Sequence, residues 1–348
     1  MLPSQFDLQL VQDRVDRVGV GQALAIGAAL VAAVTFAFGG YLTGYPPLQL
    51  AVLETIAWLP LALLGVEWIV GREVRSTAVG TVVLAIALGM AILAGHPQTA
   101  VHMVYATAAY AAWRAWPWRA RGRRTWLALG GAAALGLGLS AAGWLPALEY
   151  QHLSNRAAVD YETVAHGFPP RELLGLLIPG LTHWSPLYVG VLPLLLAILG
   201  ARRALFGTVP VARTACFFVV LAVVALLVSL GGRGPLFAPL YLLAPGFDLF
   251  RGQERAACLV SLSLAVLAGY GYAAWQADRS RTATTLLAGA AGLFALAHAL
   301  DQVLQREHQP VGRREVVLPG QHPARPVHGH RGARAHLAHH REPALDGT

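Results

Sequence analysis

Long apolar runs separated by short polar connections make up most of this 348-residue chain. Nine runs are apolar enough to enter a bilayer, and most approach the roughly 20 residues that a perpendicular helix needs to cross one. They are 18–40, 48–70, 78–94, 98–113, 126–147, 184–200, 212–230, 256–275 and 283–300. The pattern predicts an all-α fold, a polytopic transmembrane bundle of about nine helices, with no soluble domain between 18 and 300.

Two neighbouring runs, 78–94 and 98–113, are shorter than a full crossing and are separated only by Gly95-His96-Pro97-Gln98. Glycine and proline interrupt regular structure, so this spacing predicts a tight helical hairpin with its tip near the membrane surface. The run 126–147 is expected to end or kink at Pro146, because proline removes a helical hydrogen bond and clashes with the preceding turn.

Composition supports a membrane protein. Hydrophobic residues make up 56% of the chain and charged residues 13%, whereas soluble domains carry about a quarter charged residues. Cys216 and Cys258 both lie inside predicted spans, so neither a disulfide framework nor a thiolate metal site is predicted. Residues 1–17 precede an apolar run that is too long for a cleavable signal peptide, and no such peptide is expected.

Arginine is distributed unevenly between the two sides of the predicted bundle. If the spans alternate from a cytoplasmic N-terminus, the outer connections before residue 301 hold five arginines and the inner connections hold fourteen: Arg14, Arg17, Arg72, Arg75, Arg114, Arg119, Arg121, Arg123, Arg124, Arg202, Arg203, Arg213, Arg279 and Arg281. This asymmetry follows the positive-inside rule and sets the predicted orientation. The net charge of +8 therefore indicates anionic membrane lipids as partners, and not nucleic acid.

Two outward segments differ from the short inner connections. Segment 148–183 is polar and then apolar up to Pro179-Gly180, which predicts one or two short helices on the outer surface. In segment 231–255, prolines bracket an apolar run too short to cross the membrane. It predicts a re-entrant or interfacial helix, acceptable at membrane depth only where protein buries it.

His96 and Gln98, at the hairpin tip, have two interpretations. They can simply occupy a turn at the wet interface. Alternatively, they can donate hydrogen bonds to a lipid headgroup or a sugar at the outer rim. The tetrapeptide by itself leaves both open.

Acidic residues near the outer boundary are candidates for catalysis. Glu149 emerges after Pro146, with Arg156 about two helical turns further along. A carboxylate there can act as a base toward an acceptor hydroxyl, or ligate a divalent cation. A surface ion pair between Glu149 and Arg156, of small energetic value, explains the same residues. Asp160 is a further candidate, although a solvated loop acid is the better explanation of it. Apart from a divalent cation, no cofactor is predicted.

Two acids lie within the run 48–70. Glu54 is several residues inside it, where an ionisable group is expected to be functional or to face a polar cavity. Glu67 lies near the inner end and is expected to extend toward Arg72.

The segment before the run 256–275 contains a pair of arginines, Arg251 and Arg255, at i and i+4. On one helical face they can hold a phosphate or pyrophosphate, for which guanidinium geometry is well suited. Pairing with Asp248 and Glu254 in a structural network is the alternative.

The tail, about 301–348, is rich in Arg, Pro, Gly, Ala and His, and has no apolar periodicity. Such composition cannot offset the entropy of ordering, so the tail is predicted to be disordered. The chain contains no lysine, which indicates a GC-rich gene, and an out-of-frame reading of such a gene produces the same mixture. The histidine spacings match no defined metal-ligand pattern.

Several short motifs, taken in order, resemble the bacterial YfhO-type membrane protein family, which is related to the polyprenyl-linked (GT-C-type) glycosyltransferases. They cover about 38–271 and are Phe38-Gly39-Gly40-Tyr41, Ala57-Trp58-Leu59-Pro60-Leu61, Ala94-Gly95-His96-Pro97-Gln98, Gly136-Leu137-Gly138-Leu139-Ser140-Ala141 with Pro146-Ala147-Leu148-Glu149 and Arg156, Tyr188-Val189-Gly190, Pro245-Gly246-Phe247 with Phe250-Arg251, and Leu267-Ala268-Gly269-Tyr270-Gly271.

The resemblance implies a multi-pass enzyme of the bacterial plasma membrane that takes a sugar from a polyprenyl-phosphate carrier. The acceptor would be an extracytoplasmic envelope glycan. Family members have additional N-terminal spans and an acidic loop that supplies the catalytic carboxylate, so the chain is interpreted as a fragment lacking that loop. A transporter or flippase of a lipid-linked intermediate, or a non-catalytic scaffold, is the alternative. Transporters pair broken helices in two halves, and no such repeat is found in the sequence.

Overall fold

The computed structural model describes residues 5–44, 49–71, 74–118, 121–153, 160–180, 186–207, 212–277 and, within 288–299, residues 288–292, 294–296 and 298–299. The chain divides into a helical unit, Met1–Leu304, and a segment Gln305–Thr348. Arg156, Arg72 and the tail lie outside the described residues, so the predictions made for them stay predictions.

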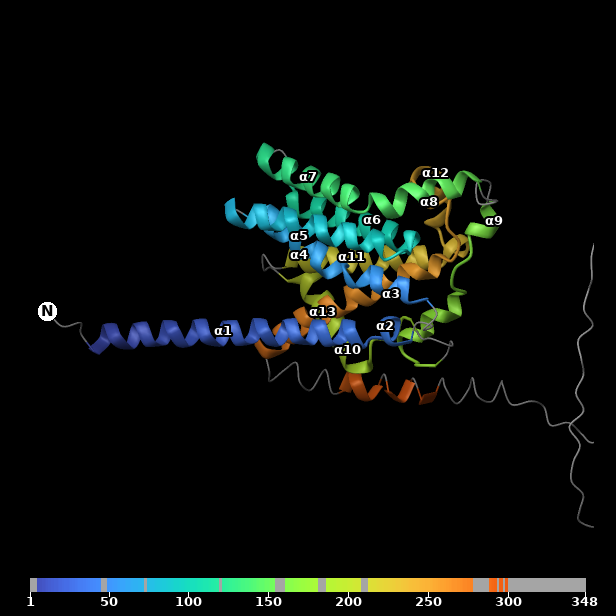
Figure 1. The fold of residues 1–348 in the computed structure, drawn as a ribbon. Coiled ribbons are helices and arrows are strands. Elements are labelled where there is room, and N and C mark those ends of the chain that lie inside the picture. Colours follow the sequence, from blue (N-terminus) through green and yellow to red (C-terminus); the bar gives the residue numbers. More distant parts are fainter. Residues whose placement is uncertain are drawn as a thin grey trace, which may run out of the picture. The chain divides into compact units, whose positions relative to one another are not determined.

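Every regular element in the described residues is helical, which confirms the all-α prediction (Figure 1). The α-helices are α1 (Gln5–Phe38), α2 (Gly40–Gly44), α3 (Leu50–Ala57), α4 (Leu59–Val70), α5 (Val74–Leu93), α6 (Pro97–Ala115), α7 (Arg123–Leu139), α8 (Ala141–Leu153), α9 (Tyr161–Val164), α10 (Val191–Phe206), α11 (Ala212–Ser229), α12 (Phe237–Leu243) and α13 (Ala257–Ala277). Three short 3₁₀ helices join them: η4 (Pro170–Leu176), η5 (Gly231–Arg233) and η6 (Gln253–Ala256).

Within the described residues, fewer helices can cross a membrane by length and composition than the nine predicted. Four qualify: Gly21–Gly44, Leu50–Val70, Ser76–Leu93 and Gln253–Ala277. The bent pair α7 and α8 makes a fifth if it counts as one span. Helix α6 carries buried polar side chains, including His102 and Thr107, and α10 has only 16 residues. Both predicted spans are therefore helices. Helix α6 is less apolar, and α10 is shorter, than a helix that crosses the membrane needs to be.

The predicted kink in the run 126–147 is placed differently by the structure. Helices α7 and α8 meet at an angle of 70° at Ser140, not at Pro146, which lies inside α8. Side chains satisfy the backbone at the bend: Ser140 Oγ donates to Gly136 O at 2.8 Å, and Trp144 Nε1 donates to Leu137 O at 3.0 Å. A hydroxyl that bonds back to the preceding turn bends helices in this way.

Helix α13 is the central element, because it packs on α1, α10 and α11, and 72% of its apolar span is buried. Small residues permit this packing. A Cβ atom on Gly271 would fall on the carbonyl oxygen of Leu196 in α10, and one on Gly200 would fall on the carbonyl oxygen of Leu267 in α13. Small residues bring helix backbones close in membrane proteins, where packing rather than the hydrophobic effect drives association.

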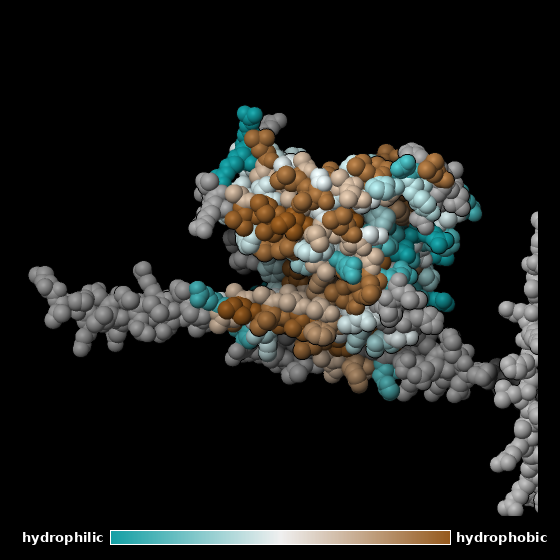
Figure 2. All heavy atoms as spheres, in the orientation of Figure 1, coloured by the Kyte–Doolittle hydropathy of each residue, from teal (hydrophilic) through white to brown (hydrophobic). Residues whose placement is uncertain are grey.

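Large apolar side chains face outward along the helices. Ile26, Leu30, Val34 and Phe38 recur every fourth residue of α1, and each is more than half exposed. Helix α5 has a similar exposed row that includes Val82. Figure 2 shows apolar residues over the middle of the visible face, with hydrophilic residues gathered toward its ends. A surface of this kind is stable in lipid, since contiguous exposed apolar area is uncommon in soluble proteins.

The two ends of the helical unit differ in chemistry. At one end, Arg213 at the start of α11 bonds to Trp113 near the end of α6, and Arg114 pairs with Glu67 near the end of α4. At the other end, the start of α6 contacts the segment before α13 through Gln98 and Gly252. The arginine-rich connections and the polar motifs therefore lie at opposite ends, as the threading requires.

We expect that a cysteine introduced at Arg124 is protected from impermeant thiol reagent in intact cells, whereas one at Glu162 is labelled. The physical reason is the positive-inside rule, applied to arginine-rich connections at one end only. Both side chains are exposed, so access from the correct side permits reaction. Labelling at 124 without labelling at 162 would reverse the orientation, and permeabilised cells provide the control for reactivity.

Candidate functional site

A framework of backbone hydrogen bonds supports the candidate site, which lies at the end of the helical unit opposite the arginine-rich connections. Phe168 N donates to Ser229 O at 2.8 Å, and Gly232 N donates to Ala165 O at 2.7 Å. Gly231 has a φ of +57° and lies directly against Ala165, where a side chain would not fit. The segment 165–168, which follows α9, is thus fixed against the end of α11.

Gln253 joins this framework to η6. It is 1% exposed, and its backbone N donates to His166 O at 2.7 Å. Its Nε2 donates to Phe250 O at 2.7 Å and to Val164 O at 3.2 Å. Its Oε1 is buried and finds no hydrogen-bond partner among the described residues. The sequence does not indicate a role for Gln253, because nothing in the local pattern distinguishes a single glutamine in a polar segment from a solvated one.

Arg255 is held in the next turn by contacts from three directions. Its Nη1 donates to Gln98 Oε1 at 3.0 Å and to Arg251 O at 2.9 Å, and Tyr41 donates from its hydroxyl to the Arg255 carbonyl at 3.3 Å. The Gln98 amide completes a bridge by donating to Gly252 O at 3.1 Å. Arg255 Nε is buried and lacks a partner among the described residues. The guanidinium is therefore pre-positioned and retains donor capacity for an anion.

His96 is the N-cap of α6 and contributes a neutral ring to the same site. Its Nδ1 accepts from the backbone N of Thr99 at 3.2 Å. Burial, followed by the positive charge of Arg255, lowers the pKa of His96 to about 4. Since Nδ1 is an acceptor, the single proton of the neutral ring lies on Nε2, which can donate to a ligand.

An apolar groove of about 580 Å³ begins beside these polar groups. Its lining includes Pro97, which lies between His96 and Gln98, and Phe250, which precedes Arg251. Tyr105 closes one wall, where its hydroxyl donates to Pro245 O at 3.1 Å. Helix α8 forms the opposite wall with Trp144, Ala147, Leu148 and Gln151. The groove is lined mostly by apolar side chains, and the lining residues Pro97 and Phe250 are sequence neighbours of His96, Gln98 and Arg251. An apolar groove with these polar groups nearby suits an amphipathic anion.

The remaining predicted site residues take different positions. Glu149 is exposed and absent from the groove lining. Helix α8 lines the groove with residues 144, 147, 148, 150 and 151, and at about 100° per residue Glu149 falls on the other side of the helix. Glu54 is exposed on α3 and does not face a buried cavity. Asp160 caps α9 by accepting from Thr163 N at 3.2 Å, and the hydrogen bonds from Thr163 lower the pKa of its carboxyl.

The expected common helical face of Arg251 and Arg255 is not formed. Gly252 adopts a φ of +85° and separates them, so that η6 begins only at Gln253. Arg251 is exposed and contributes its carbonyl to Arg255. Asp248 accepts from Gly246 N at 3.2 Å within a turn. Among the described residues, neither arginine forms an ion pair with Asp248 or Glu254, although the Glu254 carboxylate lies against the same turn at Gly252.

The second acid of the run 48–70 is paired with a distant partner. Glu67 accepts from Arg114 Nη2 at 2.7 Å and from the Tyr110 hydroxyl, and its ion pair with Arg114 Nε spans 2.6 Å. Helix α6 supplies these partners, and Arg72, toward which Glu67 is expected to extend, lies outside the described residues. The Arg114 and Glu67 side chains are each about one third exposed or less. They lie near the ends of α6 and α4, whereas the candidate site is at the start of α6.

No group of three or more His, Cys, Asp or Glu side chains able to hold a metal ion occurs in the part of the chain that the structure describes.

Comparison with known proteins identifies no relative. No protein-family model, no curated protein and no solved structure matches the chain.

Proposed function

We propose that this protein is a membrane glycosyltransferase of the polyprenyl-phosphate-sugar class, or the carrier-binding part of one. It would lie in a bacterial plasma membrane with its N-terminus in the cytoplasm. The observation that carries the proposal is the apolar groove of about 580 Å³ next to a fixed guanidinium and a neutral histidine. The resemblance of the motifs to YfhO-type proteins supports the same class.

Each part of the lipid-linked sugar has a counterpart in this arrangement. The isoprenoid chain would lie in the groove between α6 and α8, where Leu148 and Val104 form apolar walls. The phosphate would contact Arg255, since guanidinium groups bind phosphate oxygens with directed hydrogen bonds. His96 Nε2 would donate to the sugar or to the phosphate oxygen that leaves with the carrier.

In the reaction, an acceptor hydroxyl oxygen of an envelope glycan forms a bond to the sugar C1, and the bond from C1 to the carrier phosphate breaks. A carboxylate accepts the hydroxyl proton. Glu149 remains the local candidate for this base. The exposed position of its side chain on α8 requires the acceptor to approach from the surface, and the motif resemblance would assign the principal acid of the family to a loop that precedes the matched motifs.

Replacing Arg255 with glutamine is expected to weaken binding of polyprenyl monophosphate by roughly tenfold, because a charged hydrogen bond to phosphate is lost. Binding would be measured by titrating radiolabelled carrier into the full chain in nanodiscs. Arg233→Gln is the matched control: Arg233 lies at the same end and donates from Nη1 to Gly167 O at 2.8 Å, whereas Arg255 donates to Gln98, which follows the groove residue Pro97. Equal affinity of the Arg255→Gln variant and the wild type would contradict the assignment.

A second measurement separates transfer from transport. Proteoliposomes would receive a carrier with a radiolabelled sugar and an envelope glycan. Release of the sugar from the carrier supports the glycosyltransferase. Movement of the intact lipid across the bilayer, without sugar release, would indicate a flippase instead and contradict the proposal.

A further inference from the structure

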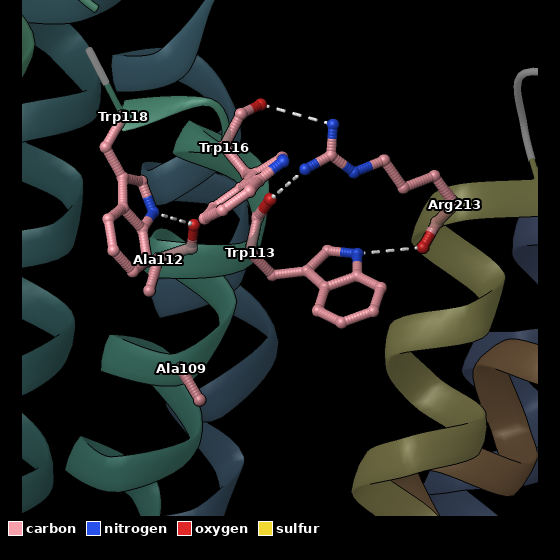
Figure 3. Close-up of a pocket in the computed structure, with 6 residues that line it drawn as sticks. All are labelled: Ala109, Ala112, Trp113, Trp116, Trp118 and Arg213. Atoms are coloured by element: carbon pink, nitrogen blue, oxygen red, sulfur yellow. Dashed lines mark hydrogen bonds between the residues drawn. The ribbon is translucent and has the colours of Figure 1, made fainter.

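A second cavity, of about 690 Å³, lies at the arginine-rich end of the helical unit. It is lined by Ala109, Ala112, Trp113, Trp116, Trp118 and Arg213. Figure 3 shows the indoles of α6 and the segment after it arranged around the Arg213 side chain, which reaches across from α11. We call it the tryptophan pocket. It is at the opposite end of α6 from the candidate glycosyltransferase site.

Reciprocal hydrogen bonds position Arg213 at the mouth of the tryptophan pocket. Its Nη2 donates to Trp113 O at 3.0 Å, its Nη1 donates to Trp116 O at 3.2 Å, and Trp113 Nε1 donates to Arg213 O at 2.9 Å. The guanidinium thus caps the last carbonyls of α6, where a cation is favoured by the helix dipole. These two bonds use two of its five N–H groups. Three more are available for an anion at this exposed position.

The walls of the tryptophan pocket are rigid and apolar. Trp118 Nε1 donates to Ala112 O at 2.8 Å, which fixes its ring. Trp116 and Trp118 contact edge to face, with centroids 5.0 Å apart. Both indoles are about half exposed, at 53% and 50%. Indole rings concentrate at the level of lipid headgroups, where an apolar body and a polar N–H are both satisfied.

The charge around the tryptophan pocket selects the sign of its ligand. Glu67 is the acid that the described contacts place at this end, and it is already paired with Arg114. The arginines carried by the surrounding helix ends are Arg114, Arg121, Arg123, Arg124, Arg202, Arg203 and Arg213. Such an excess attracts anionic lipid over zwitterionic lipid.

We propose that the tryptophan pocket binds an anionic phospholipid. One acyl chain would lie against Ala109, Ala112 and the Trp113 ring, and the phosphate and headgroup would contact Arg213. The pocket lies where α6 ends and α11 begins, so the lipid would enter from the surrounding leaflet. Binding here would hold α6 to α11 at the end of α6 opposite His96. The inference does not depend on the proposed transferase activity.

The test uses the full chain purified in non-ionic detergent and titrated with phosphatidylglycerol brominated on its acyl chains. Bromine quenches nearby indole fluorescence, and three of the nine tryptophans line the pocket. Half-maximal quenching is expected at a concentration roughly tenfold lower than for the brominated phosphatidylcholine counterpart, as one charged contact to the headgroup would provide. Arg213→Gln should remove this difference and leave binding of polyprenyl monophosphate unchanged.

Two further variants keep the test decisive. Ala112→Leu fills the pocket without changing charge and should reduce quenching by both lipids. If Arg213→Gln does not fold, the quenching measured with Ala112→Leu still tests the proposal. Arg233→Gln, at the opposite end, should behave as wild type. The proposal is overturned if Arg213→Gln retains the preference for phosphatidylglycerol, if Ala112→Leu is quenched as strongly as wild type, or if Arg213→Gln lowers carrier binding instead.

Discussion

Replacing Gly271 with alanine is expected to lower the stability of the helical unit by about 3 kcal/mol or more, since overpacking against a backbone cannot be relieved by a side-chain rotation. The added Cβ atom would fall on the carbonyl oxygen of Leu196, so α10 and α13 must separate. Because α13 is packed on three other helices, the separation cannot be confined to one contact. Thermal unfolding of the detergent-solubilised protein would measure the effect.

Gly131→Ala in α7 is the matched control for this prediction. No atom lies within 4 Å of a Cβ atom added at Gly131, and alanine favours a helix over glycine by up to about 1 kcal/mol. The same substitution should therefore be neutral or slightly stabilising in α7. Equal unfolding temperatures for the two variants would show that close backbone contact between α10 and α13 does not stabilise the unit.

Replacing Gln253 with leucine is expected to cost about 2–4 kcal/mol, because one buried and one partly buried carbonyl oxygen lose their donor while the side-chain volume is retained. The bonds lost are those to Phe250 O and Val164 O. Since η6 then loses its attachment to the segment 164–168, Arg255 should also lose its fixed position. We therefore expect weaker binding of polyprenyl monophosphate in addition to a lower unfolding temperature.

Gln276→Leu serves as the comparison for Gln253→Leu. Gln276 donates to Tyr272 within the same helix and lies at the other end of α13 from η6. A Gln253→Leu variant that unfolds like Gln276→Leu and binds carrier like wild type would contradict the supporting role of Gln253.

The apolar runs by themselves determined the helical class and the approximate positions of the helices. A run of apolar residues long enough to span lipid must satisfy its backbone internally, and a helix does so with local bonds alone. The distribution of arginine likewise predicted which connections lie at the same end of the bundle, because the positive-inside rule needs only the position of each charge in the sequence. Pro146 and Ser140 show where this local reasoning stops. Proline gave the stronger sequence signal, but the bend occurs at Ser140, where side chains bond to the carbonyls of the preceding turn.

The partners of the polar side chains were decided by the tertiary structure. Arg255 and Gln98 are 157 positions apart and share a hydrogen bond, and Glu67 pairs with Arg114, 47 positions away. The sequence selected His96, Gln98 and Arg255 as polar groups near span ends, but the close approach of their helices depends on glycine contacts and on the framework around Gln253. Hydrogen bonds require distances of about 3 Å. Local pattern specifies which residues reach an end of the bundle, whereas only long-range packing specifies which of them meet.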